Sequence, residues 1–130
     1  MKMRREHRNP LSRQAFEIVM DSWSEVRGVE LLFPSHISNR KLISENAFNS
    51  VLRRLGYTKE EVTTHGFRVT ASTILNERQH NPDVIEAILA HQDTNSIRRT
   101  NNRTTYSDQR VELMQTWADL CDEFKSKFGN

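Results

Sequence analysis

The sequence predicts a mainly α-helical domain with a small β hairpin or sheet at its N-terminal end. Two observations predict the helices: apolar residues recur at three- and four-residue steps, and capping residues separate these stretches. A third observation predicts the hairpin, because residues 2–9 are polar and lead into Pro10 as an extended arm does. A length of 130 residues fits one domain around a single core.

Two helices are expected in the first half of the chain. The first follows Ser12, a residue type favoured at the N-cap, and Gly28 can stop it. Its apolar face comprises Phe16, Val19, Trp23 and Val26. Residues 31–34 form a short extended piece, because the residue before a proline avoids helical backbone angles. Ser44 caps the second helix and Gly56 ends it.

Capping patterns also mark the middle of the chain. Thr58 and Glu61 have the spacing of a capping box. A helix then runs over about 65–78. Asn81-Pro82 combines an N-cap residue with the residue favoured at the first helical position, and the short helix that follows ends near His91.

The last predicted helix begins at Ser107, after a polar loop at residues 92–105. Its apolar face comprises Leu113, Met114, Trp117, Leu120, Cys121, Phe124 and Phe128. This face fits either the core of the domain or a surface of a helical protein-interaction domain, and we favour the core.

Composition and charge limit the class of protein. With 35 % apolar and 28 % charged residues, the chain describes a soluble domain, and no apolar run approaches the roughly 20 residues of a membrane span. The charged start has no apolar segment behind it, so no secretory signal is expected. The lone Cys121 fits a reducing cytoplasm. Net charge is only +2, but basic residues cluster in 1–13 and 97–110, which indicates either a polyanion surface or solvated faces.

Four side chains form the candidate site. His65 and Arg68, three residues apart, fall on one side of a helix turn. His91 closes an apolar helix, and Tyr106 precedes the last one. An arginine fork for negative oxygens, two imidazoles and a phenol suit phosphodiester chemistry without a metal. Each residue also has a structural interpretation, such as a surface arginine or an aromatic anchor at a helix start.

No metal or other cofactor is expected from the sequence. The remaining histidines are scattered along the chain, and the single cysteine is far from them. They are His7, His36 and His80.

Three segments carry a resemblance to a known family. THGFRVTASTILNE, NPDVIEAILAH and YSDQRVELMQTWADLCDEF resemble the catalytic domain of tyrosine recombinases, most of all the phage and prophage integrases of the P4 type. The opening MKMRREHRNPLS is similar to the family's lysine-bearing hairpin. The resemblance implies the fold of the DNA breaking-rejoining catalytic domain, truncated at its N-terminus. Residues 1–130 would be a partial C-terminal catalytic domain without the core-binding and arm-binding domains.

The resemblance also implies a reaction and roles. A tyrosine attacks the scissile phosphate, forms a 3′-phosphotyrosyl link and frees a 5′ hydroxyl. Lys2 would protonate the leaving 5′ oxygen, His65 and Arg68 match the family's HxxR pair, and His91 matches its second histidine position. The implied partners are double-stranded DNA and other integrase protomers, with no membrane, and the implied location is the cytoplasm, for a bacterial or phage-encoded protein. The basic residues expected on DNA are Arg4, Arg5, Arg98, Arg99 and Arg103.

Two departures from the family pattern leave enzymatic activity open. The family's first catalytic arginine lies upstream of the lysine hairpin, in a helix that this sequence lacks. The usual nucleophile position falls near Thr100 and Asn101, and only the later Tyr106 remains as a nucleophile. The chain is therefore either a catalytic fragment that uses Tyr106 or an inactive, DNA-binding remnant of an integrase.

Overall fold

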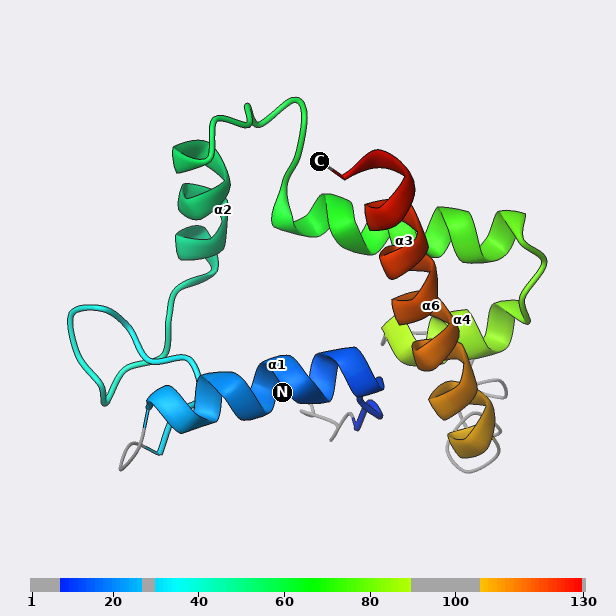
Figure 1. Ribbon diagram of the computed structural model, residues 1–130, viewed down its shortest axis with the longest axis horizontal. Helices are drawn as coiled ribbons and strands as arrows, with labels where there is room; N and C mark the ends of the chain where they lie inside the picture. Colours follow the sequence, from blue (N-terminus) through cyan, green and yellow to red (C-terminus); the bar gives the residue numbers. More distant parts are fainter. Residues whose placement is uncertain (1–7, 27–29, 90–105, 130) are drawn as a thin grey trace, which may run out of the picture. The chain divides into compact units, whose positions relative to one another are not determined.

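The structure is a computed structural model that describes residues 8–26, 30–89 and 106–129. The chain divides into two compact units: residues 1–14 with 71–130, called the terminal unit, and residues 15–70, called the middle unit. The described helices are α1 (Arg13–Glu25), α2 (Glu45–Arg54), α3 (Thr64–Glu77), α4 (Pro82–Leu89) and α6 (Ser107–Phe128), as Figure 1 shows. The prediction of a mostly helical protein is confirmed.

The small N-terminal hairpin is not seen. Residues 1–7, which hold most of it, lie outside the described part of the chain, and the described residues contain no named strand. Extended backbone does occur at the end of the predicted 31–34 piece, where Pro34 forms an isolated antiparallel bridge with Leu42.

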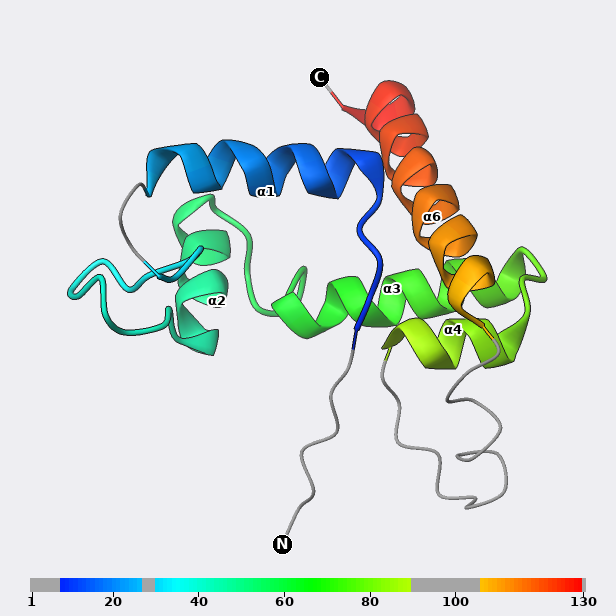
Figure 2. The same cartoon turned by 90° about the horizontal axis from the view of Figure 1, so that it is seen from below.

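The core of the terminal unit joins three helices. Leu75 of α3 and Ile85 of α4 have no exposed surface, and buried side chains of α6 complete the cluster. Its buried members are Leu75, Val84, Ile85, Ile88, Leu113 and Leu120. Figures 1 and 2 show α4 beside the second half of α3 with α6 packed across both. The buried cluster is therefore formed by two consecutive helices, α3 and α4, and by α6, which comes later in the chain.

The apolar face predicted for the last helix is mostly correct. Leu113 and Leu120 are buried, and Met114, Trp117 and Phe124 pack against the cluster. Cys121 and Phe128 are exposed, so their placement in the core was wrong. By helical spacing Cys121 falls only about 20° from Met114, so the spacing does not explain its exposure, whereas Phe128 is the last helical residue.

Helix ends follow the capping residues. The side chain of Asn81 accepts the N–H of Asp83 at 3.0 Å, and Pro82 occupies the first position of α4. The side chain of Glu61 accepts the N–H of Thr58 at 2.7 Å, as the capping-box spacing predicts, although the residues form a turn. Ser44 occupies the N-cap of α2, but its side chain makes no capping hydrogen bond.

The end of α2 is a Schellman motif. Gly56 has a φ of 96°, its N–H donates to Arg53 O at 3.0 Å, and the N–H of Tyr57 donates to Leu52 O at 3.2 Å. The end of α3 has the same pattern with a non-glycine residue. Gln79 has a φ of 62°, and its N–H and that of His80 return to the last turn of the helix.

The middle unit has no buried residue among those that the structure describes. The helix predicted after Ser12 is present as α1, but the burial of its apolar face is not. Phe16 is 54 % and Trp23 51 % exposed, and only Val19 and Val26 of that face are half-buried. Hydrogen bonds therefore carry more of the local order here than apolar contacts do.

Within the described residues, none of the helices combines the length and the apolar character that crossing a membrane requires.

Truncation of Leu75 tests the core. Leu75→Ala is expected to lower the free energy of unfolding by about 2–5 kcal/mol, because it leaves a cavity where three helices meet. Val111→Ala on the exposed side of α6, where Val111 is 54 % exposed, should change it by less than about 0.5 kcal/mol. Urea unfolding of the full chain measures both, and a cost for Leu75→Ala below about 1 kcal/mol would contradict the described core.

Replacement of Gln79 tests the end of α3. Gln79→Gly is expected to raise stability by about 1 kcal/mol, since a side chain with a left-handed backbone conformation costs about that much. Gly56→Ala is the reciprocal control and should lower stability by a similar amount, because an added Cβ there meets no atom within 4 Å and only the backbone conformation is strained. Thermal unfolding measures both changes, and a destabilising Gln79→Gly would refute the prediction.

Candidate functional site

The HxxR pair lies at the start of α3. His65 and Arg68 fall in its first two turns, three residues apart and so on the same side of the helix. His65 is exposed and Arg68 is half-buried. One helix therefore positions both groups, as the sequence predicts. The N-terminal end of a helix also carries a partial positive charge, which favours an anion near the same groups.

Two side chains cap this end of α3. Thr63 occupies the N-cap, and its Oγ1 accepts the N–H of Gly66 at 3.0 Å. Asn49 of α2 accepts both the N–H of Thr64, at 3.0 Å, and its hydroxyl, at 2.9 Å. Neither cap was predicted from the sequence. Thr63, three residues before Gly66, is a local signal that could have revealed the first, whereas Asn49 has none.

The glycine of the HGFR segment fits this cap closely. A Cβ at Gly66 would lie 3.3 Å from Thr63 Oγ1, tighter than an ordinary contact. A larger residue would therefore press on the hydroxyl that caps the helix. Glycine lets the capped first turn bring His65 and Arg68 to the surface without that crowding.

A hollow of about 330 Å³ lies beside the same helix end but is not the site. Lys59, Thr63, Gly66 and Phe67 line it together with the acidic Glu60 and Glu61. Neither His65 nor Arg68 is among its lining residues. The carboxylates also oppose a bound phosphate there.

In the terminal unit, three segments that lead to the other predicted site residues are hydrogen-bonded together. Asn9 donates to Ile88 O at 2.7 Å, and Arg110 donates to Arg8 O and, at 2.8 Å, to Asn9 Oδ1. The N–H of Arg110 returns to Tyr106 O at 2.8 Å. The segment after Lys2, the end of α4 before His91 and the start of α6 at Tyr106 thus meet at Asn9.

Most of the other predicted site residues lie outside the described residues: Lys2, Arg4, Arg5, His91, Arg98, Arg99 and Arg103. Thr100 and Asn101, near the position where a nucleophile is expected, also lie outside them. Tyr106 is described. It occupies the N-cap of α6, is half-buried, packs against the core cluster and makes no side-chain capping bond. It belongs to the terminal unit, whereas His65 and Arg68 belong to the middle unit. The assignment of these residues to one site stays a prediction.

No group of three or more histidine, cysteine, aspartate or glutamate side chains in the described ranges is arranged to hold a metal ion.

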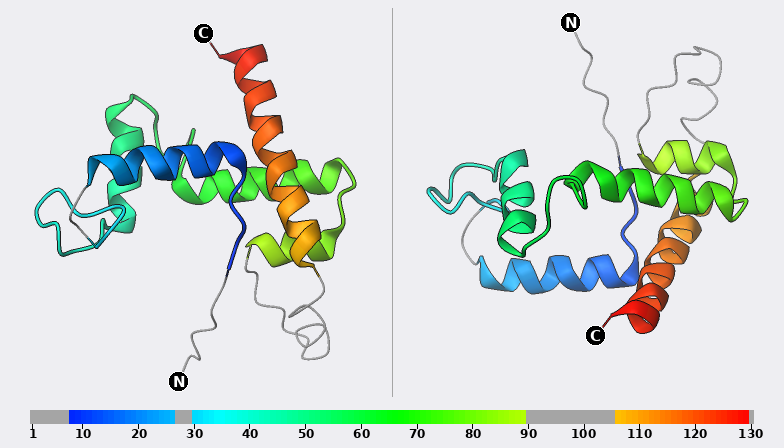
Figure 3. Two further views of the ribbon diagram at one scale, coloured as in Figure 1. Left: turned by 60° about the horizontal axis from the view of Figure 1, so that its bottom comes forward. Right: turned by 90° about the horizontal axis from the view of Figure 1, so that it is seen from above.

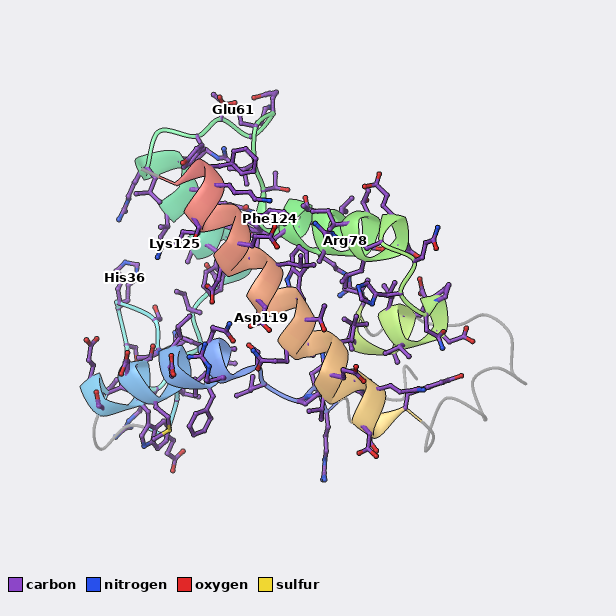
Figure 4. The ribbon with its side chains drawn as sticks, turned by 45° about the vertical axis from the view of Figure 1, so that its right-hand side comes forward. His36, Glu61, Arg78, Asp119, Phe124 and Lys125 are labelled. Carbon is purple, nitrogen blue, oxygen red and sulfur yellow. The ribbon has the colours of Figure 1, made fainter. Side chains whose placement is uncertain are left out.

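The N-terminal segment is also tied to α6 by side chains. Residues 8–12, dark blue in Figure 3, pass along α6. At their end Gln14 Nε2 donates to Asp119 Oδ1 and to Asp122 Oδ2, each at 2.9 Å, and Gln115 also donates to Asp119 at 2.9 Å. Figure 4 labels Asp119 in the middle of α6. The hydrogen bonds from Gln14 and Gln115 hold the pKa of the Asp119 carboxyl below its usual value.

This pKa shift predicts a pH dependence of stability. Because the folded pKa is depressed, the stabilisation is complete above the ordinary aspartate pKa and is lost as pH falls through the folded value. The melting temperature should therefore fall less between pH 6 and pH 2 for Asp119→Asn than for the unsubstituted chain. Asp21→Asn, an exposed change on α1, is the control. Identical pH profiles for Asp119→Asn and the unsubstituted chain would show that the carboxylate contributes nothing.

Comparison with known proteins gives the context of these residues. The Phage integrase family matches residues 1–107. The chain is 45 % identical over 120 residues to prophage integrase IntA of Escherichia coli (strain K12), covering 92 % of this chain and 29 % of that protein. It is 42 % identical over 132 residues to the integrase of Enterobacteria phage P4, covering 98 % and 30 %. It is 40 % identical over 124 residues to the integrase of Shigella phage Sf6, covering 95 % and 32 %.

The chain thus spans about three tenths of the length of these relatives. No solved structure matches it. The family match includes His65, Arg68, His91 and Tyr106 and covers most of the chain. The chain therefore belongs to the phage integrase family and is a tyrosine recombinase sequence of the P4 type.

Proposed function

We propose that this chain carries the catalytic residues of a site-specific DNA recombinase that integrates phage or mobile-element DNA. The observation that carries the proposal is the capped start of α3, where His65 and Arg68 lie on one side of the helix in a member of the phage integrase family. The relatives are named integrases. The activity is a proposal because the chain covers only 29–32 % of those three proteins.

In the proposed reaction each residue has one task. The Tyr106 oxygen attacks the phosphorus, the new O–P bond makes a 3′-phosphotyrosyl link, and the bond to the 5′ oxygen breaks. Arg68 binds the non-bridging oxygens as they gain charge, because its guanidinium matches two oxygens at once. His65 and His91 donate hydrogen bonds to the same phosphate and move protons. Lys2, on a hairpin formed by residues 2–9, protonates the leaving 5′ oxygen.

The contacts of Asn9 support this assignment. They hold together the described ends of the segments that lead to Lys2, His91 and Tyr106. Double-stranded DNA is the proposed substrate, bound in part by Arg4, Arg5, Arg98, Arg99 and Arg103. Other integrase protomers on the same DNA and a cytoplasmic location belong to the same proposal.

A second candidate function is DNA binding without chemistry. Asn101 stands where the family nucleophile is expected, and the ring of Tyr106 packs against the core as an aromatic anchor would. Such a remnant would keep the phosphate contacts of Arg68 and lose the covalent step. Its binding to DNA would weaken steeply with salt, because it would rest on phosphate contacts.

Substitution of the tyrosines tests directly which residue is the nucleophile, because the chain has only two of them. The full chain is incubated with a pool of nicked duplexes of randomised sequence, and covalent protein–DNA adducts are separated under denaturing conditions. Tyr106→Phe should abolish the adduct, whereas Tyr57→Phe, at an exposed residue of the middle unit, should leave it unchanged. Salt-sensitive binding with no adduct from the unsubstituted chain would establish the remnant. Loss of the adduct only in Tyr57→Phe would refute Tyr106 as nucleophile.

A further inference from the structure

Two side chains on α2 grip the connection that leads into the site helix. Arg53 uses both ends of its guanidinium: Nη1 donates to Tyr57 O at 2.6 Å and Nη2 to Val62 O at 2.5 Å. Asn49, one turn earlier on α2, accepts the two hydrogen bonds from Thr64. Together they hold both ends of the segment 57–64. That segment ends one residue before His65.

Apolar packing does little to place this segment. None of its residues is buried, and only Val62 and Thr63 are half-buried. Within it, the side chain of Glu61, labelled in Figure 4, bonds the N–H of Thr58 and so shapes the turn locally. The hydrogen bonds from α2 tie both ends of the segment to another helix. The last of them reaches Thr64, the first residue of α3.

We propose that Arg53 and Asn49 are positioning residues, which hold the start of α3 so that His65 and Arg68 are presented together to one DNA phosphate. This inference rests on the function proposed above. A guanidinium is suited to the task because its planar fork can reach two carbonyl oxygens at once, and a lysine ammonium cannot reproduce that geometry. Hydrogen bonds from a charged donor are also stronger than neutral ones.

The neighbouring arginine separates this role from a DNA contact. Arg54 is exposed on the same helix turn and carries the same charge, whereas the Nη groups of Arg53 are bonded to backbone carbonyls. Arg53→Gln and Arg54→Gln therefore remove equal charge. Only Arg53→Gln removes the guanidinium group that binds the segment 57–64.

Hydrogen exchange of backbone amides tests the clamp without requiring activity. In the full chain, Arg53→Gln should speed exchange at the Gly66 and Arg68 amides at least tenfold and leave the Leu75 and Ile85 amides of the core unchanged. Neither tested amide donates to Arg53, so the effect reports the position of the helix start. Arg54→Gln should change nothing there. Equal exchange in Arg53→Gln and the unsubstituted chain would overturn the proposal.

Conservative variants guard against simple misfolding. Arg53→Lys keeps the charge and loses the fork, so it should resemble Arg53→Gln. Asn49→Asp keeps an acceptor oxygen and should preserve slow exchange, whereas Asn49→Ala should not. Asn46→Ala, at an exposed asparagine on α2, is the matched control. Slow exchange in Asn49→Ala or fast exchange in Asn49→Asp would contradict the assigned contacts.

Rate and affinity on the nicked duplex pool then separate positioning from stability. Arg53→Gln should lower the rate of phosphotyrosyl formation 10- to 100-fold while the Kd for the duplex changes less than threefold. A larger loss of affinity than Arg54→Gln shows would make Arg53 a DNA contact and refute the proposal. If the unsubstituted chain forms no adduct, the catalytic function fails, and the exchange measurements still decide whether the clamp exists.

Discussion

The burial of Leu75 and Ile85 is the interaction on which the fold of the terminal unit depends. Both side chains are fully buried, and each contributes about 1.5–3 kcal/mol relative to an exposed position. They bring the consecutive helices α3 and α4 together with α6, which comes later in the chain. The burial also fixes one end of α3, the helix whose other end carries His65 and Arg68. The site helix is thus anchored by packing at its far end and by polar contacts at the end that would meet a phosphate.

The difference between the packed end and the hydrogen-bonded end of α3 has an energetic consequence. A typical hydrogen bond contributes about 0.5–1.5 kcal/mol net, so the capped and clamped start of α3 can open locally at a lower free energy than the core can. Arg53 and Asn49 oppose that opening with four hydrogen bonds from a single helix. Preorganised donors are effective in phosphoryl transfer because they need not reorient as charge develops. A site built at the less stable end of a helix therefore depends on its clamp more than on the core.

The features predicted correctly from the sequence are those that neighbouring residues determine. Asn81-Pro82, Gly56 and the final helix follow rules that act within a few residues, and HGFR was correctly placed on a helix. The clamp could not be predicted, because Arg53 and Asn49 bind groups nine and fifteen residues away and leave no periodic signal. The left-handed backbone conformation of Gln79 could not be predicted either, because glutamine, unlike glycine, has no preference for it. The apolar residues of α1 have the spacing of a buried face, but this periodicity does not show which element would cover them.

The packing of Tyr106 beside the core is compatible with both catalysis and a structural role. Even if attack on a phosphate required the ring to leave its half-buried position beside the core, the energetic cost would be small. Since full burial of a large apolar side chain is worth about 1.5–3 kcal/mol, exposing a half-buried one costs on the order of 1 kcal/mol. A free-energy cost of that size slows a reaction by about tenfold at most. This is small compared with the rate enhancement of enzymes, which spans many orders of magnitude. An amide cannot form a phosphotyrosyl link at any population, so Asn101 could not take over the covalent step. In the proposed reaction, the packing of Tyr106 is therefore only a small energetic obstacle.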